Sequence, residues 1–274
     1  MTSFHVLTSG SEIQEFPVVR KIGFSDLRDA LSEGFSDFGA MPSHLLFLAI
    51  IYLVIGIFLY ASTSGQNALP LLFPVLAGYA LTGPFAAIGL YEVSRRREQG
   101  QPHSWNYAFS VLRSPAMPSI LAVGFTLMVI LLLWLVSAQA LYQSEFGVWW
   151  APQSYRQFFD QLMTTNAGHR LLILGVGIGF IYAVIAFSIG AISFPLLLDR
   201  DVGAAVAILT SVKAVWKNPM VMAAWAFIVA AALFVGVATL FVGLAVVTPI
   251  LGHATWHLYR RVIEPRESIR GRYL

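Results

Sequence analysis

Two histidines near the end of the chain are the residues best suited to bind a metal ion or a haem. They lie in LGHATWHLYRR, where His253 and His257 are four residues apart. Side chains with this spacing lie on one face of an α-helix, one turn apart. Imidazole is a common ligand of zinc, copper and iron. An ionisable residue inside a membrane helix is a functional candidate, so the pair raises the question of a bound cofactor.

Two carboxylates are predicted to lie at the same membrane edge as the histidines. Glu92 and Asp199 end apolar stretches that run in the same direction as the stretch carrying the histidine pair. Imidazole and carboxylate together suit a divalent cation, so the candidate metal ligands are Glu92, Asp199, His253 and His257. The alternative is that these residues lie at the headgroup level, solvated or paired with arginines. Arg260, three residues after His257, favours this alternative.

Other cofactor and catalytic chemistry has little support in the sequence. The chain contains no cysteine, which excludes thiolate-bound zinc, iron–sulfur clusters and cysteine-ligated haem. A haem held by His253 and His257 is disfavoured, because axial ligands come from facing helices and these two share one helix. The sequence has no phosphate-binding glycine loop, nucleophile elbow or HExxH pair. We therefore expect no cofactor, no catalytic residue and no enzyme activity.

The composition predicts an all-α, polytopic membrane protein. Hydrophobic residues make up 57% of the chain and charged residues 11%, against about a quarter in soluble domains. A helix of about 20 apolar residues crosses a bilayer. The chain has six such spans, paired as three hairpins: residues 45–61, 68–91, 120–141, 171–198 and two within 219–259 that a tight turn near 236–243 separates. The glycines of GVGIGF, Gly175 and Gly179, are expected to form a helix-packing face.

The positive charges predict how these spans are oriented. Of the 17 Lys and Arg residues, only Arg156 and Arg170 fall on the side opposite to the termini. Positive charge collects on the cytoplasmic side of membrane proteins, so we expect both termini in the cytoplasm. The predicted organisation is an N-terminal tail (1–23), a single six-helix membrane domain (24–260) and a basic C-terminal tail (261–274). The net charge of +3 gives no support to a nucleic-acid partner.

A short amphipathic helix is predicted at the membrane interface before each hairpin. In FSDLRDALSEGFSDFGAMP, Ser25 is the expected N-cap and one narrow face is apolar. That face comprises Phe24, Leu27, Leu31, Phe35 and Phe38. SWNYAFSVLRSP repeats the pattern with a face that includes Leu112, and DVGAAVAILTSVKAVWKNP repeats it with Val202, Val206, Leu209 and Trp216.

This layout resembles a known group of proteins. ISFPLLLDRDVGAAVAILTSVKAVWKNP, running on into GHATWHLYRR, resembles an uncharacterised family of predicted bacterial inner-membrane proteins. Some relatives carry a cytochrome c oxidase label. The resemblance implies six membrane helices and a location in the bacterial inner membrane, and it supplies no catalytic residue.

These observations predict a non-catalytic protein with a structural or accessory role. The expected partners are membrane lipid, another membrane protein or a second copy of the chain. One alternative is a small-molecule carrier or channel, because prolines within the predicted spans could expose backbone carbonyls to a substrate. A further alternative is an accessory subunit of a respiratory oxidase that binds a metal or haem.

Overall fold

The computed structural model describes residues 16–41, 87–102, 107, 109–147, 155–239 and 242–265. These residues form helices and contain no β-strand; Val19 and Ile263 make one isolated antiparallel bridge. The chain divides into two compact units, one of residues 125–188 and one of residues 1–124 and 189–274. The labelled helices are α1 (Phe24–Ala40), η1 (Phe109–Arg113), α5 (Met117–Phe146), α6 (Tyr155–Thr164), α7 (Asn166–Asp199), α8 (Ala204–Lys217), α9 (Pro219–Ala238) and α10 (Leu244–Val262), and a further helix covers 87–98.

Three helices of the described residues are long and apolar enough to cross a membrane. They are α5, α7 and the Pro219–Gly236 part of α9. The predicted spans 120–141 and 171–198 lie inside α5 and α7, and α7 continues as a helix through Pro195. The predicted span 45–61 and most of 68–91 lie outside the described residues.

The long apolar stretch at the end of the chain is broken where the sequence predicted a turn. Helix α9 ends at Ala238 and α10 begins at Leu244. The backbones come close here, since a Cβ on Gly243 would lie 3.1 Å from the Cα of Gly236. Helix α10 is not among the three candidate membrane helices, so a sixth span stays a prediction.

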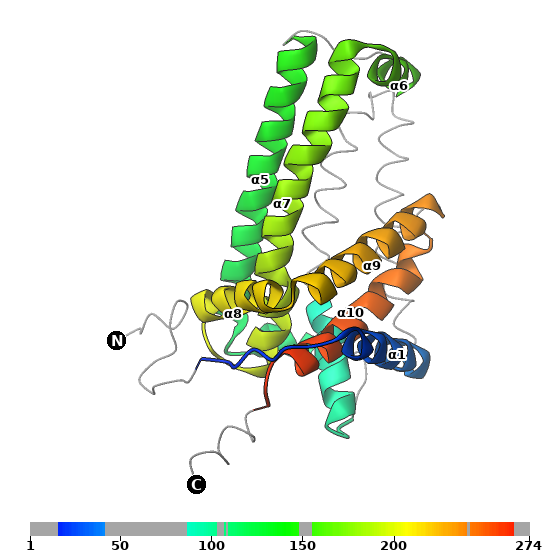
Figure 1. Ribbon diagram of the computed structural model, residues 1–274. Coiled ribbons are helices and arrows are strands. Elements are labelled where there is room, and N and C mark those ends of the chain that lie inside the picture. Colours follow the sequence, from blue (N-terminus) through cyan, green and yellow to red (C-terminus); the bar gives the residue numbers. More distant parts are fainter. Residues whose placement is uncertain are drawn as a thin grey trace. The chain divides into compact units, whose positions relative to one another are not determined.

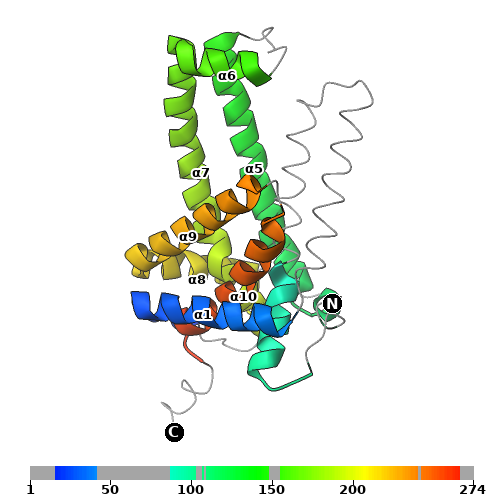
Figure 2. The same ribbon diagram turned by 90° about the vertical axis from the view of Figure 1, so that its right-hand side faces the viewer.

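Helices α5 and α7 pack together within residues 125–188 (Figures 1 and 2). A Cβ on Gly179 would lie 3.5 Å from Trp134 Nε1, so the absence of a side chain there permits close contact. Ser137 and Tyr182 hydrogen-bond through their hydroxyls at 2.9 Å. Gly179, with Gly175 one turn before it near Leu141, forms the packing face predicted from GVGIGF.

In the other unit, α1 lies across α10, and the helix 87–98 packs against α10 as well (Figure 2). Both contacts need glycine. A Cβ on Gly34 would lie 2.7 Å from the backbone nitrogen of Ala254, and one on Gly252 would lie 2.4 Å from Leu90 Cδ1. The core around these contacts contains Trp225, Trp256, Tyr259, Leu90 and Leu258.

The buried face of α1 coincides only in part with the apolar face that the sequence predicted for the membrane interface. The residues packed into the unit are Leu27, Ala30, Gly34 and Asp37, of which Leu27 alone belongs to the predicted face. Phe24 and Phe35 are 59% and 58% exposed. The small size of Ala30 and Gly34 lets α1 approach the α10 backbone closely. The N-cap prediction of Ser25 is also wrong.

The helix begins one residue after Gly23, and the Asp26 carboxylate accepts the Gly23 N–H at 2.8 Å. Asp26 lies in the first turn, where a carboxylate also interacts favourably with the helix dipole. The side chain that accepts a backbone N–H at the start of α1 is therefore that of Asp26, inside the first turn.

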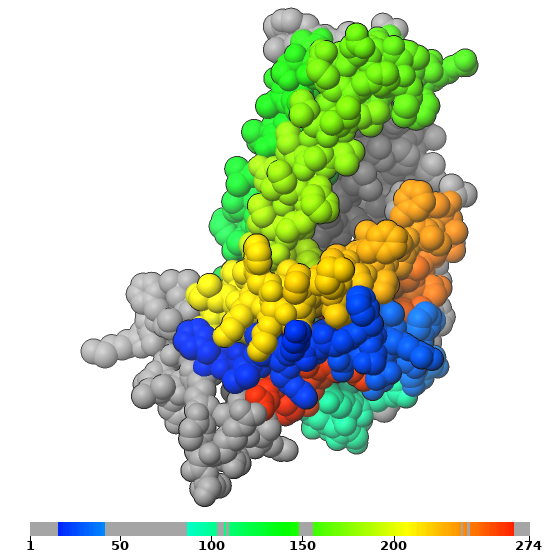
Figure 3. All heavy atoms as spheres, viewed as in Figure 1, coloured from blue at the N-terminus to red at the C-terminus, as the bar shows by residue number. Residues whose placement is uncertain are grey.

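Helix α8 also buries mostly small residues, which are Ala204, Ala207, Thr210, Ser211 and Ala214. Of the predicted apolar face, Val202 is buried, whereas Leu209 and Trp216 are exposed, Trp216 at 76%. Figure 3 shows α8 in yellow and α1 in blue on the same face of this unit. Leu112 of η1, in the remaining predicted amphipathic segment, is exposed too; residues 104–106 and 108 of that segment lie outside the described residues.

Both ends of the described chain pack against the same region. Arg20 donates its N–H to the Val262 carbonyl at 2.7 Å, and Glu264 donates its N–H to Val18 at 3.0 Å. The Asn218 side chain accepts the N–H of Ile22 at 2.9 Å. The sequence analysis placed residues 18–22 and 262–264 in the tails. In the structure these two segments bond to each other, and residue 22 bonds to Asn218 at the α8–α9 junction.

The Gly34→Ala variant is expected to lose about 2 kcal/mol of unfolding free energy, because the new methyl group overpacks the contact between α1 and the Ala254 backbone. Gly39→Ala, on the same helix with nothing within 4 Å of the added Cβ, is the matched control. It should be neutral or gain about 0.5 kcal/mol from helix propensity. The measurement is denaturant unfolding in detergent. Equal effects at the two positions would contradict the close contact.

Candidate functional site

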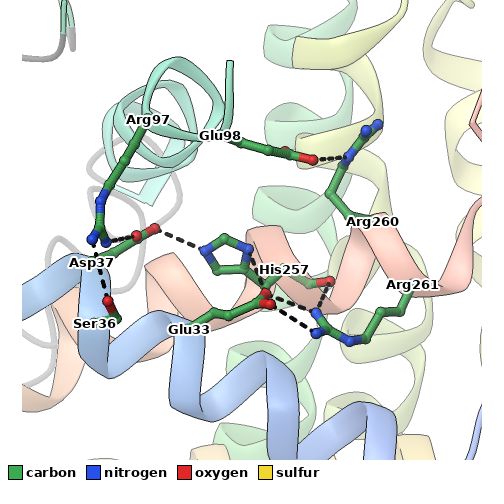
Figure 4. Close-up of a pocket in the computed structure, with 8 residues that line it drawn as sticks. All are labelled: Glu33, Ser36, Asp37, Arg97, Glu98, His257, Arg260 and Arg261. Atoms are coloured by element: carbon green, nitrogen blue, oxygen red, sulfur yellow. Dashed lines mark hydrogen bonds and ion pairs between the residues drawn. The ribbon is translucent and has the colours of Figure 1, made fainter. Parts of the chain in front are cut away.

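A buried carboxylate, Asp37, lies where α1, the helix 87–98 and α10 meet (Figure 4). Its Oδ2 accepts hydrogen bonds from Ser94 Oγ at 2.5 Å and from His257 Nε2 at 2.8 Å. Its Oδ1 forms an ion pair with Arg97. Two other segments far apart in the sequence thus supply the partners of this carboxylate: the helix 87–98 contributes Ser94 and Arg97, and α10 contributes His257.

Glu33, one turn before Asp37 on α1, forms the next part of the network. Arg261 donates two hydrogen bonds to its carboxylate, at 2.9 and 3.0 Å. His257 Nδ1 lies 3.0 Å from Glu33 Oε2. Both ring nitrogens of His257 therefore face carboxylate oxygens, which accept hydrogen bonds and do not donate them when ionised. The cationic imidazolium, with two N–H donors, satisfies this arrangement fully.

His253 is completely buried and reaches Asp37 through a serine. Its Nδ1 lies 2.7 Å from Ser94 Oγ, and the same hydroxyl contacts Asp37. Its Nε2 has no hydrogen-bond partner among the described residues, although the carbonyl of Leu90 interacts with the ring electrostatically. The two histidines of the sequence motif thus bear on one carboxylate, His257 directly and His253 through Ser94.

The network holds its carboxylates in the ionised form. Burial alone would raise the pKa of Asp37, but hydrogen bonds from His257 and Ser94 and the nearby histidine charge bring its pKa below the ordinary value. The hydrogen bond from Arg261 is the main reason that the pKa of Glu33 is also lowered. These carboxylates therefore stabilise the folded state through charge pairing.

A cavity of about 410 Å³ opens beside this network (Figure 4). It is lined by Glu33, Ser36, Asp37, Arg97, Glu98, His257, Arg260 and Arg261. Arg260 donates to Glu98 at 2.9 Å, so every arginine lining the cavity already has a carboxylate partner. The charged side chains that line this cavity therefore pair with one another.

The other two candidate ligands belong to separate clusters. Glu92 is buried and binds Arg95 and Arg96 at 2.8 and 2.6 Å. Asp199 accepts a hydrogen bond from the Tyr259 hydroxyl at 2.6 Å and pairs with Arg200 at 3.3 Å. Both carboxylates are thus paired with arginine, which is the alternative that the sequence analysis raised.

Comparison with known families was informative for one part of the chain. The sequence model of a family described as predicted integral membrane protein (DUF2189) matches residues 72–199. This stretch, less than half of the chain, is similar to the DUF2189 family. The expected resemblance to an uncharacterised family is confirmed, and the family description carries no oxidase label. No match was found among curated proteins or among solved structures.

The DUF2189 match covers only part of the charge network. It includes Ser94, Arg97 and Glu92, and it ends at Asp199, before α10 begins. The two histidines and Asp37 therefore lie outside it. The site combines residues of the DUF2189 region with residues that flank it on both sides.

The structure does not gather the four candidate metal ligands into one group. His253 and His257 face Asp37, whereas Glu92 and Asp199 bind arginines. The described part of the chain contains no group of three or more histidine, aspartate or glutamate side chains placed to hold a metal ion. Metal binding by these four residues stays a prediction.

The sequence analysis missed Asp37, which lies outside the apolar face that it predicted for this helix. A signal was present in the spacing. Leu27, Ala30, Gly34 and Asp37 recur at intervals of three and four residues, so Asp37 continues a stripe of mostly small residues. A carboxylate on such a stripe indicates a buried partner of opposite charge.

The Asp37→Asn variant is expected to lower the unfolding free energy at neutral pH by about 3 kcal/mol, since it leaves Arg97 and His257 without their common partner. Because the pKa values of Asp37 and Glu33 are lowered in the folded state, their stabilisation is present at neutral pH. It is lost as the pH falls through those folded-state pKa values.

Thermal midpoints between pH 7 and the acid range test both statements. The wild-type midpoint should fall on acidification, and the fall should be shallower in Asp37→Asn. Asp29→Asn, a substitution of an exposed carboxylate on the same helix, is the control and should follow the wild type. A wild-type curve that Asp37→Asn merely displaces, with an unchanged slope, would contradict the charge-pairing role.

Proposed function

We propose that this chain is a non-catalytic membrane protein of structural or accessory role, with α1 and α8 lying in the cytoplasmic headgroup layer. The observation that carries the proposal is the exposure of large apolar residues on these two helices. Each buries small residues within the protein and leaves large apolar residues exposed, among them Phe24, Phe35, Leu209 and Trp216. In a chain with membrane-crossing helices, the bilayer interface is the apolar phase that would cover such a face.

The arrangement of charges supports a specific topology. In a six-span bundle of three hairpins with both termini in the cytoplasm, α1, α8 and the charge network around Asp37 lie on the cytoplasmic side. The arginines of this network then follow the positive-inside pattern. We place the chain in the bacterial inner membrane on the family resemblance and on this pattern.

The proposed role is contact with lipid, with another membrane protein or with a second copy of the chain. The pairing of the ionisable side chains with one another supports a non-catalytic role. The ionisable side chains that attracted catalytic or metal-binding hypotheses are paired with one another, as in the contact of Asp37 with His257 and that of Glu92 with Arg96. Such pairing favours fixed geometry over reactivity.

The depth of α1 and α8 in the membrane can be measured directly, because the chain contains no cysteine. Spin labels on single-cysteine variants at Phe35 and Trp216 should show high collision rates with oxygen and low rates with a water-soluble nickel complex. A label at Asp29, an exposed position about 120° around α1 from Phe35, is the control and should show the opposite. Water-like accessibility at all three positions would refute the interfacial location.

Labelling from outside the cell tests the topology. Cysteines introduced at Gln99 and Arg156 lie on exposed helix ends or loops. A membrane-impermeant maleimide should label Arg156→Cys in intact cells and Gln99→Cys only after lysis. Labelling of Gln99→Cys in intact cells would reject the six-span orientation.

A further inference from the structure

A second cavity in the larger unit, of about 340 Å³, is rich in arginine. Four segments line it: the helix 87–98, η1, the turn that precedes α5, and the end of α7 with the residues that follow. Its charged residues are Arg95, Arg96, Arg113, Arg200, Glu92, Asp199 and Asp201. This cavity is distinct from the one beside Asp37, and no residue lines both.

The balance of charges in this cavity leaves positive charge available. Four arginines face three carboxylates. Glu92 is engaged by Arg95 and Arg96, and Asp199 is engaged by Arg200 and, from outside the cavity, by Arg260 at 3.8 Å. The carboxylates of the cavity therefore do not neutralise its cations, even with Asp201 counted.

Two of the arginines have donors to spare. The side chain of Arg113 is exposed and makes no hydrogen bond or ion pair with any described residue. Arg96 uses Nε for Glu92, and its guanidinium carbon lies 4.1 Å from the centre of the Tyr107 ring. An arginine guanidinium offers a planar fork of N–H donors that matches the oxygens of a phosphate.

The start of α5 adds to the positive potential. Ser114, Pro115 and Ala116 line the cavity, and α5 begins immediately afterwards at Met117. The amino end of a helix carries partial positive charge. Its first N–H groups are already used, since Ala116 donates to Ser114 Oγ and Met117 donates to the Ser114 carbonyl. Leu112, next to Arg113 in the sequence, is exposed outside the cavity lining and offers an apolar surface.

We propose that this cavity binds the phosphate of an anionic phospholipid, with Arg113 and Arg96 as its ligands and Leu112 against an acyl chain. The proposal rests on the proposed function, because that topology puts the cavity at the cytoplasmic headgroup level. The excess of positive charge selects a headgroup with net negative charge over a zwitterionic one. Ion pairs with Glu92 hold Arg95 and Arg96 in position.

The test is a titration of the purified full chain in neutral detergent with dioctanoyl phosphatidylglycerol, dioctanoyl phosphatidylcholine or sodium phosphate, followed by the thermal midpoint. Phosphatidylglycerol should raise the midpoint saturably. Arg113→Gln should weaken its apparent affinity by about tenfold, the effect of losing a charge-assisted contact. Arg28→Gln removes an exposed arginine from α1 and should bind phosphatidylglycerol like the wild type.

Three results would overturn the proposal: equal weakening in Arg113→Gln and Arg28→Gln, equal stabilisation by phosphatidylcholine, or saturable binding of sodium phosphate at the affinity of the lipid. The last would identify the ligand as a soluble phosphate. Because these titrations are made in detergent, they do not depend on membrane depth. A failure of the spin-label experiment with success here would reject the interfacial helices alone.

Discussion

The larger unit depends on a carboxylate that has been taken out of water. Burial of an unpaired charge is costly, and the cost is offset only when partners of opposite charge and hydrogen-bond donors surround it. Asp37 obtains these from two other segments, Ser94 and Arg97 on the helix 87–98 and His257 on α10. The close contact of Gly34 with Ala254 brings α1 near enough for this to happen. Packing and charge pairing are therefore one constraint: neither is satisfied unless the other is.

The sequence predicted those features that local composition determines. Helices α5 and α7 follow from long apolar runs, and the break between α9 and α10 follows because 41 apolar residues exceed the thickness of a bilayer. The face on which α1 packs could not be predicted in the same way. Hydrophobic periodicity locates the apolar side of a helix but does not say which residues contact the rest of the protein. Here the contact with α10 requires residues as small as Ala30 and Gly34, and Phe24 and Phe35 of the predicted apolar side are exposed.

The candidate site was missed for a related reason. Asp37 was passed over because it lies outside the predicted apolar face of its helix, and the histidines were grouped with Glu92 and Asp199 because all four were predicted to lie at one membrane edge. Such a prediction does not specify partners. Partner choice depends on which helices touch, and only the three-dimensional contact of α1 with α10 determines that His257 meets Asp37. Arginines from which the orientation was predicted, such as Arg95, Arg97 and Arg261, are likewise bound to carboxylates, so only some of their charge is available to other molecules.

The link between the two ends of the described chain has a consequence for biosynthesis. Asp37 and His257 are separated by 220 positions, and Arg20 bonds to Val262. A ribosome makes α1 early and α10 late, so α1 must wait for nearly the whole chain before its partner exists. During that interval its acidic groups remain hydrated and its small-residue stripe is uncovered. The contacts of α1 therefore form only after α10 has been synthesised, and a chain that stops before α10 leaves Asp37 without His257.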